Sequence, residues 1–137
     1  NKLLRETRIT IQKTRAQNLL ARPAESRENI RTMRKLAHIG IPTDKKPAKA
    51  SHLADAKLFV TDPADTKNGI EFLYFEEGSP MPEILKKAAH IAYMVDDIEA
   101  ELEGAEILIP PFEPFPNLKA AFVLEDGGVP VELMQKF

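Results

Sequence analysis

The stretch AHIAYMVDDIEAELEGAEILIPPFEPFPNLKAAFVLEDGGVPVELMQ, residues 89–135, decides the fold of this chain. Its beginning and its end alternate between apolar and other residues, a pattern that aims every second side chain at the same face of a sheet. His90 lies in the first alternating run and Glu132 in the last one. A rougher version of the same layout precedes it, with His38 and Glu71 in the corresponding places. Two histidines and two glutamates on strands predict a metal site.

The second half of the chain, about residues 88–137, predicts a complete β-α-β-β-β module. Its alternating apolar runs predict strands, and the acidic pair DD can cap a short helix that a glycine ends. The proline-rich segment PPFEPFPN predicts an irregular connection, and the turn EDGG predicts a hairpin. The predicted elements are strands over 90–95, 105–109, 118–124 and 129–134, and a helix from Asp96 or Asp97 to Glu103, in front of Gly104.

The first half, about residues 35–78, repeats this order in a shorter form, and an internal repeat constrains the fold more than any single motif. AHIGIP matches AHIAYM, and both halves contain FV, then an acidic turn with glycine, then a Glu. The two candidate ligands are 33 positions apart here, against 42 in the second half, so residues 43–56 have too little room for a full helix and a strand. The predicted strands are 36–42, 58–61 and 70–75, and strict alternation in the first places Leu36, His38 and Gly40 on one side and Ala37, Ile39 and Ile41 on the other.

Length and composition bound the class of protein. With 137 residues, of which 43% are hydrophobic and 29% charged, the chain can bury one core, which predicts one main globular unit. The chain has no cysteine, so disulfides, thiolate metal sites and cysteine nucleophiles are excluded, and a metal needs nitrogen and oxygen ligands. No apolar run approaches the ~18 residues of a membrane span, and the N-terminus lacks a secretory core, so we expect a soluble, cytoplasmic protein.

The N-terminal part has a different charge from the rest. Residues 1–35 carry ten Lys or Arg against three Glu, a balance of +7, whereas residues 36–137 carry 9 basic and 18 acidic residues, a balance of −9. We predict a basic, mostly helical arm over residues 1–34 that lies on the acidic body of its own or a neighbouring subunit. A nucleic-acid contact is the competing interpretation, and the absence of aromatic residues between Asn1 and Lys35 argues against it.

The segments HIAYMVDDIEAELEG, EILIPP and AFVLEDGGVPVELMQ together resemble the vicinal oxygen chelate superfamily, which includes glyoxalase I, methylmalonyl-CoA epimerase, extradiol dioxygenases and bleomycin resistance proteins. The resemblance covers roughly residues 35–135. It implies an α+β fold in which paired β-α-β-β-β modules form a curled mixed sheet, a cup, around a divalent metal, with the first module abbreviated. It also implies that the ligands come from the first and last strand of each module, at His38, Glu71, His90 and Glu132.

The predicted function is that of a metal-dependent isomerase or lyase of the glyoxalase and epimerase kind, which acts on a small substrate. Two imidazoles and two carboxylates suit Zn, Ni, Co, Mn or Fe and leave positions for two substrate oxygens. Glu132 and Glu71 are the candidate catalytic residues, since either can take a proton next to a carbonyl. The alternatives are a metal-free binding protein of the bleomycin-resistance kind and an extradiol-dioxygenase-like enzyme with Fe(II) on His38, His90 and Glu132. Glu71 would fill a position that oxygen chemistry needs open. The resemblance also implies a homodimer.

Apolar side chains of the body are candidates for the substrate pocket, although about half of them must face away from the cup. Strict alternation puts Tyr93 opposite to His90, and Tyr74 opposite to Glu71. The third histidine, His52, lies in a polar stretch and is predicted to be a surface residue. No Lys or Arg of the body lies in a phosphate-binding motif, which gives no support for a phosphorylated or CoA-type substrate. The candidates are Phe59, Phe72, Tyr74, Tyr93, Met94, Phe112, Phe115 and Phe122.

Overall fold

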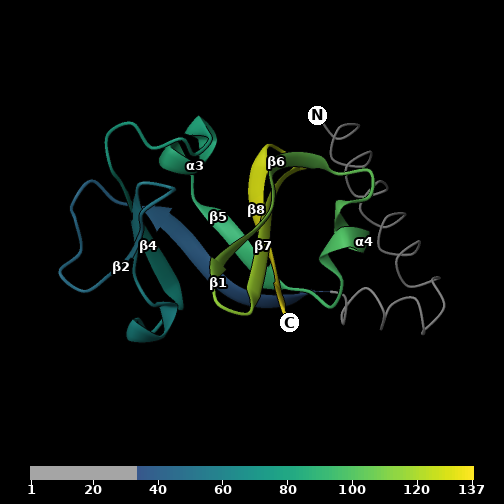
Figure 1. Cartoon of the computed structure of the whole chain (residues 1–137), viewed down its shortest axis with the longest axis horizontal. Helices are drawn as coiled ribbons and strands as arrows, with labels where there is room; N and C mark the ends of the chain where they lie inside the picture. The colour runs from purple at the N-terminus through teal and green to yellow at the C-terminus, as the bar shows by residue number, and fades with distance from the viewer. Residues whose placement is uncertain (1–33) are drawn as a thin grey trace, which may run out of the picture. The chain divides into compact units, whose positions relative to one another are not determined.

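Eight strands form one mixed sheet in the computed structural model, which describes residues 34–137 of the chain (Figure 1). In chain order the elements are β1 (Lys35–Pro42), β2 (Ser51–Leu53), β3 (Leu58–Val60), a 3-10 helix η1 (Pro63–Asp65), β4 (Ile70–Phe75), α3 (Glu83–Lys87), β5 (His90–Met94), α4 (Ile98–Leu102), β6 (Glu106–Phe115), β7 (Leu118–Glu125) and β8 (Val129–Lys136). Their order across the sheet is β2-β3-β4-β1-β5-β8-β7-β6. Apart from Arg34, the predicted helical arm lies outside the described residues.

The sheet consists of two modules with the same strand order. In the first module β1 pairs in parallel with β4, and in the second β5 pairs in parallel with β8. The two first strands, β1 and β5, pair antiparallel and join the modules in the middle of the sheet. The curled α+β sheet of paired modules that the sequence predicts is therefore confirmed.

The first module keeps all four strands but has no helix between its first two strands. Residues 43–50 connect β1 to β2 without regular structure, as their short length predicts. The strand β2 was not predicted, because Ser51 and His52 are polar and exposed and, with Leu53, make a run too short to show apolar alternation. Pairing with β3 holds it at the sheet edge, where the ring of His52 stacks on Phe59 at 4.2 Å between centroids.

The strand β6 is longer than predicted, and this corrects the irregular connection expected for PPFEPFPN. It continues through the prolines to Phe115, with three shifts of register against β7. Proline has no N–H to donate, which is tolerated at the edge of a sheet because one side of an edge strand needs no partner. Since β6 is the outermost strand of its module, its edge position explains why the prolines do not end it.

A bulge in β1 changes which side chains share a face. The pairing with β5 shifts between Leu36 and His38, so that Leu36 lies opposite Tyr93 while His38 lies opposite Ala92. Ala37 packs against the cluster around Ala92, on the face of His38. The predicted sides of Leu36 and Ala37 are therefore wrong, because a bulge adds one residue and interrupts strict alternation.

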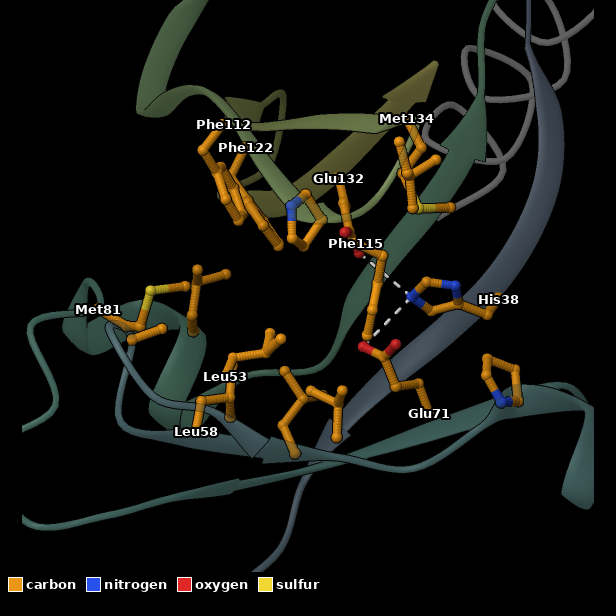
Figure 2. A pocket seen from close by; sticks show the side chains of 17 residues that line it. His38, Leu53, Leu58, Glu71, Met81, Phe112, Phe115, Phe122, Glu132 and Met134 are labelled. Carbon is orange, nitrogen blue, oxygen red and sulfur yellow. Dashed lines mark ion pairs between the residues drawn. The ribbon is translucent and has the colours of Figure 1, made fainter. Parts of the chain in front are cut away.

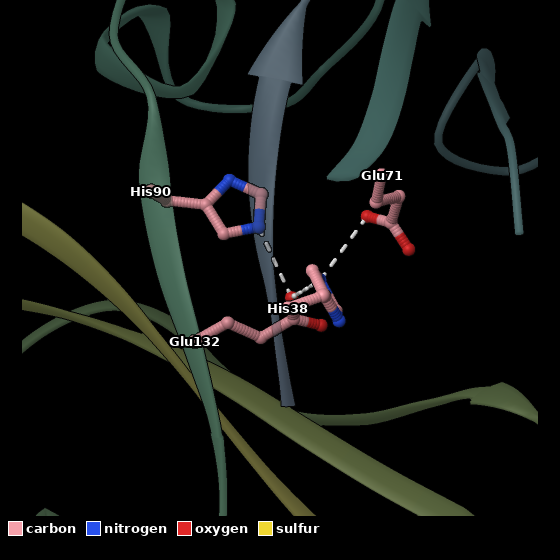
Figure 3. A group of neighbouring side chains, drawn as sticks. All are labelled: His38, Glu71, His90 and Glu132. Atoms are coloured by element: carbon pink, nitrogen blue, oxygen red, sulfur yellow. Dashed lines mark hydrogen bonds and ion pairs between the residues drawn. The ribbon is translucent and has the colours of Figure 1, made fainter. Parts of the chain in front are cut away.

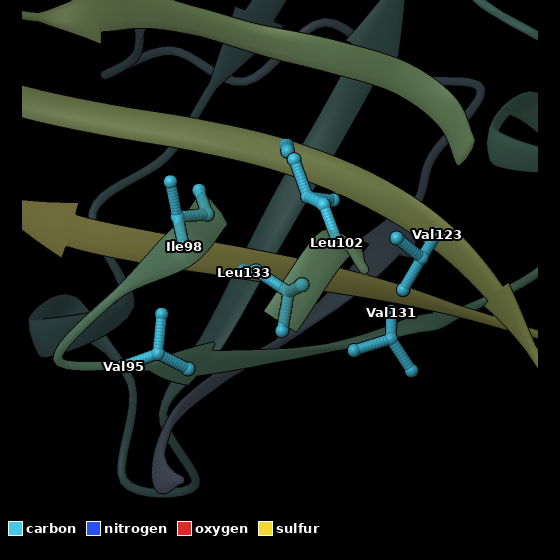
Figure 4. Close-up of a cluster of buried hydrophobic side chains, with 7 residues drawn as sticks. Val95, Ile98, Leu102, Val123, Val131 and Leu133 are labelled. Carbon is cyan, nitrogen blue, oxygen red and sulfur yellow. The ribbon is translucent and has the colours of Figure 1, made fainter. Parts of the chain in front are cut away.

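The largest buried cluster lies on the outer face of the second module, under α4 (Figure 4). The Asp97 side chain caps this helix by accepting hydrogen bonds from the N–H groups of Glu99 and Ala100, as one of the two predicted caps. Ile98 and Leu133 are fully buried there. This cluster anchors one face of the sheet and leaves the other face free for a site. Its members are Val95, Ile98, Leu102, Ala121, Val123, Val131 and Leu133.

Within residues 34–137, none of the helices is long and apolar enough to cross a membrane.

Candidate metal centre

The four predicted ligands lie on the four central, adjacent strands of the sheet, one on each of β4, β1, β5 and β8. The register in which these strands pair brings the four residues together. Glu71 and His90 both lie beside Gly40, whereas His38 and Glu132 both lie beside Ala92. All four side chains therefore leave the same face of the sheet, and they converge as Figure 3 shows. One ligand atom from each lies within 4.8 Å of the others.

The distances among these side chains are short and involve both glutamates. The Nε2 of His90 donates a hydrogen bond to Oε2 of Glu132 over 3.1 Å. The Nε2 of His38 lies 3.2 Å from the same Glu132 oxygen and 3.5 Å from Oε1 of Glu71, but neither approach has the alignment of a hydrogen bond. Glu132 is thus held between both histidines, whereas Glu71 contacts one.

Burial and charge make the cluster favourable for a cation. His38, His90 and Glu132 are buried, and Glu71 is partly buried. Burial alone would lower the pKa of His38, but the carboxylates of Glu132 and Glu71 outweigh it and raise this pKa to about 10. Burial alone would raise the pKa of Glu132, but His38 and His90 outweigh it and lower this pKa. In the described part of the chain no Lys or Arg pairs with either glutamate, so among these residues only a protonated histidine or a bound metal ion can bring a positive charge to these oxygens.

The donor set fits a divalent transition metal. It offers two imidazole nitrogens and two carboxylates, the ligands that suit Zn, Ni, Co, Mn and Fe. The Nε2 of His38 is buried and has no hydrogen-bond partner, although it points at the carboxylates. A metal ion at the centre of the four side chains would satisfy that nitrogen and both carboxylates at once.

Gly40 makes the convergence possible. It lies opposite His90 in the pairing of β1 and β5, and the imidazole ring of His90 lies against its Cα. A Cβ at this position would overlap the ring at Cε1, Nε2 and Nδ1. A side chain of any size at residue 40 would therefore push His90 out of the cluster.

An apolar cavity of about 240 Å³ opens beside the four ligands, and His38, Glu71 and Glu132 form part of its wall (Figure 2). Three of the predicted pocket residues line it, namely Phe112, Phe115 and Phe122. The rings of Phe112 and Phe122 stack with centroids 6.4 Å apart, and the rings of His90 and Phe122 lie nearly perpendicular with centroids 5.2 Å apart. The other candidates do not line the cavity: Phe59, Phe72, Tyr74, Tyr93 and Met94.

Sequence reasoning missed the aliphatic part of the wall, including two residues that lie between the predicted modules. Met81 lines the cavity from the loop before α3 and Leu85 from α3 itself, a segment between the two modules for which the sequence analysis predicted no element. Leu85 is almost fully buried. The spacing of Met81, Ile84 and Leu85, three and four positions apart, is the signal that could have predicted a helical turn with one apolar side.

The third histidine, His52, lies away from the ligands, as predicted. Its side chain is exposed and pairs with Glu76 at the edge of the first module. It is a natural control for the two histidines of the centre.

No family model matches the chain, and no curated protein matches it. Among solved structures the chain is similar to a hypothetical protein, BH1468, from Bacillus halodurans C-125, with 20% identity and a TM-score of 0.53 over 76% of this chain and 95% of the other. A second structure, the NAD-dependent benzaldehyde dehydrogenase from Legionella pneumophila, aligns with 11% identity over 69% of this chain and 81% of the other, and its TM-score of 0.38 supports no conclusion. The likeness to BH1468 shows a shared fold, and the residues of the site itself carry the functional argument.

Proposed function

We propose that this chain is a divalent-metal-dependent enzyme of the glyoxalase and epimerase kind, which binds a small substrate through two adjacent oxygens and moves a proton on it. One observation carries the proposal. Two histidines and two glutamates from corresponding strands of both modules bring their ligand atoms within 4.8 Å of one another, at the wall of a cavity. The resemblance of the sequence to the vicinal oxygen chelate superfamily supports the same function.

The chemistry follows from the donor set. A divalent ion held by these four side chains would act as a Lewis acid on two substrate oxygens. The protein surrounds the reacting atoms with buried side chains and the rings of Phe112 and Phe122, which exclude water and strengthen electrostatic interactions.

Glu71 is the better candidate for the residue that takes the proton. Glu132 contacts both His38 and His90, and its side chain is buried, so it is held in one place. Glu71 contacts His38 at the longer distance of 3.5 Å, is more exposed, and also lines the cavity where a substrate would lie. A base must reach the substrate carbon, which favours the glutamate with fewer contacts.

The position of Glu71 also bears on the oxygenase alternative. A dioxygenase of the two-histidine, one-carboxylate type needs open positions on the iron for oxygen and substrate. Glu71 stands as a fourth donor beside that triad, which favours isomerase or lyase chemistry.

Metal analysis tests the proposal. We expect purified protein to bind about one divalent ion per chain, and His90→Ala to lose most of this binding because it removes a buried donor. His52→Ala is the matched control, since it removes an exposed histidine outside the centre. Wild-type protein that takes up none of Zn, Ni, Co, Mn and Fe would contradict the proposal and favour a metal-free binding protein.

Proton transfer tests the reaction class. With zinc-saturated protein in D₂O, we expect small α-hydroxyketones to exchange the hydrogen next to the carbonyl, as followed by NMR. Glu71→Gln at saturating zinc should slow the exchange at least about 100-fold, the usual contribution of a general base. Exchange at the wild-type rate in this variant would remove Glu71 from the role of base.

A further inference from the structure

The wall of the cavity divides into one polar end and a large apolar remainder. Seventeen of the described residues line it, and fourteen of them have apolar side chains. The three polar ones are His38, Glu71 and Glu132, which all belong to the candidate metal centre. In Figure 2 Leu53, Leu58 and Met81 lie across the cavity from His38 and Glu71. A ligand that fills the cavity therefore meets polar atoms at one end of its length.

From this division we infer that the substrate is a small, uncharged molecule whose body is apolar, and aromatic by preference, with its two oxygens at one end. The inference rests on the proposed function, because the centre is what would hold those oxygens. It adds to that function the chemical class of the part of the substrate that lies outside the metal centre.

The lining excludes charged substituents. Among residues 34–137 the lining has no Lys, Arg, Ser, Thr, Asn or Gln, so a carboxylate, phosphate or ammonium group beyond the centre would lose its water without gaining a partner from these residues. Burying an unpaired charge costs several kcal/mol or more, roughly the whole free energy of binding of a small ligand. At the centre itself, two carboxylates balance the charge of a divalent ion, which leaves no net charge to attract an ionic substrate.

The volume of the cavity and its aromatic side chains indicate the size and type of the apolar part of the substrate. A volume of about 240 Å³ holds roughly eight groups of the size of water, at ~30 Å³ each, which corresponds to one ring with a short substituent. The stacked rings of Phe112 and Phe122 flank this space beside His90, and offset stacking favours an aromatic guest. Phe115, which is 38% exposed, stands where the cavity meets solvent.

Hydroxamates with different bodies test the inference, because each presents the same two oxygens to the metal. On zinc-loaded protein, measured by calorimetry, we expect benzohydroxamate to bind about tenfold or more tightly than acetohydroxamate, the gain from burying a phenyl ring. We expect 4-carboxybenzohydroxamate to lose that gain. Equal affinities for all three, or tighter binding of the carboxylate, would overturn the inference.

Two variants at equally exposed positions test whether the preference for an apolar ligand comes from the cavity. Phe115 and Val129 are both 38% exposed, but only Phe115 lines the cavity. Phe115→Asp should weaken the binding of benzohydroxamate about tenfold and leave the zinc content and the affinity for acetohydroxamate unchanged. Val129→Asp should change neither of the two affinities nor the zinc content. An equal loss in both variants, or no loss in Phe115→Asp, would contradict an apolar site behind this rim.

Methyl NMR separates a failure of this inference from a failure of the proposed function. In metal-free protein with ¹³C-methyl methionine, toluene should shift the signals of Met81 and Met134, which line the cavity from different elements. If toluene shifts them but zinc-treated protein binds no hydroxamate, the apolar site stands and the proposed function fails. If zinc and hydroxamates bind without preference and toluene shifts neither signal, the proposed function stands and the substrate class is wrong.

Discussion

Each module contributes one histidine and one glutamate to the cluster, but the buried apolar residues of the two modules have different roles. The second module has a capped helix, α4, over a buried cluster on the outer face of the sheet, and none of that cluster lines the cavity. The first module lacks this helix, and all three members of its own buried cluster, Leu58, Val60 and Leu73, line the cavity. Each module thus supplies one His and one Glu to the cluster, while the apolar residues of the modules have separate roles.

The largest effect that we expect tests whether the apolar residues of the two modules have separate roles. Leu133→Ala, in the cluster under α4, should cost about 2–5 kcal/mol of unfolding free energy, because it leaves a void in a close-packed region. Leu73→Ala should cost at least about 1 kcal/mol less, because Leu73 already borders a cavity and has fewer atoms packed around it. Urea denaturation of metal-free protein measures both. If Leu73→Ala is the more destabilising, the first module is as much a scaffold as the second.

The two glutamates provide the next comparison. Glu132→Gln should weaken zinc binding more than about 100-fold, because the carboxylate of Glu132 lies between both histidines and is buried. Glu71→Gln should weaken it about tenfold less, because Glu71 has one longer contact. Competition against a chromophoric chelator gives both constants. Equal losses would show that the modules contribute equally to the metal.

The two modules differ by one carbon atom at corresponding positions. Gly40 lies beside His90, and its counterpart beside His38 and Glu132 is Ala92. Gly40→Ala should reduce zinc affinity about 10–100-fold, the range seen when ligand orientation is disturbed, since the added methyl displaces the ring of His90. Gly104→Ala is the control. Its φ of 71° makes the change strained, but a Cβ there meets nothing within 4 Å, so it should lower stability and leave zinc affinity unchanged.

The smallest effect concerns the helix that the first module lacks. Asp97→Ala removes the cap of α4 and should cost about 1 kcal/mol of unfolding free energy, with zinc affinity unchanged. Asp97→Asn should retain most of the stability, since the amide oxygen can accept the same hydrogen bonds. A loss of zinc binding in Asp97→Ala would mean that the outer face and the centre are coupled.

Much of the centre could be predicted because its signals are local. His90 and Glu132 lie in clear alternating runs, and the same pattern in the first half pointed to His38 and Glu71. The structure brings all four side chains together. Alternation has one weakness, which the bulge in β1 exposes: one extra residue moved Ala37 to the face of His38 and Leu36 away from it.

The sequence by itself determined the order of the modules, the approximate positions of the strands of the second half and the four residues that converge in the cluster. The reason is that period-two alternation, turn residues and a repeated pattern act over a few neighbouring positions. Only the tertiary structure decided the strand β2, the extension of β6 through its prolines and the apolar cavity. Each of these depends on which strand lies alongside: β2 exists because β3 pairs with it, the prolines are tolerated because β6 is an edge, and the cavity needs side chains from both modules. The need for a glycine at residue 40 belongs to the same class, since only the pairing with β5 brings the ring of His90 against it.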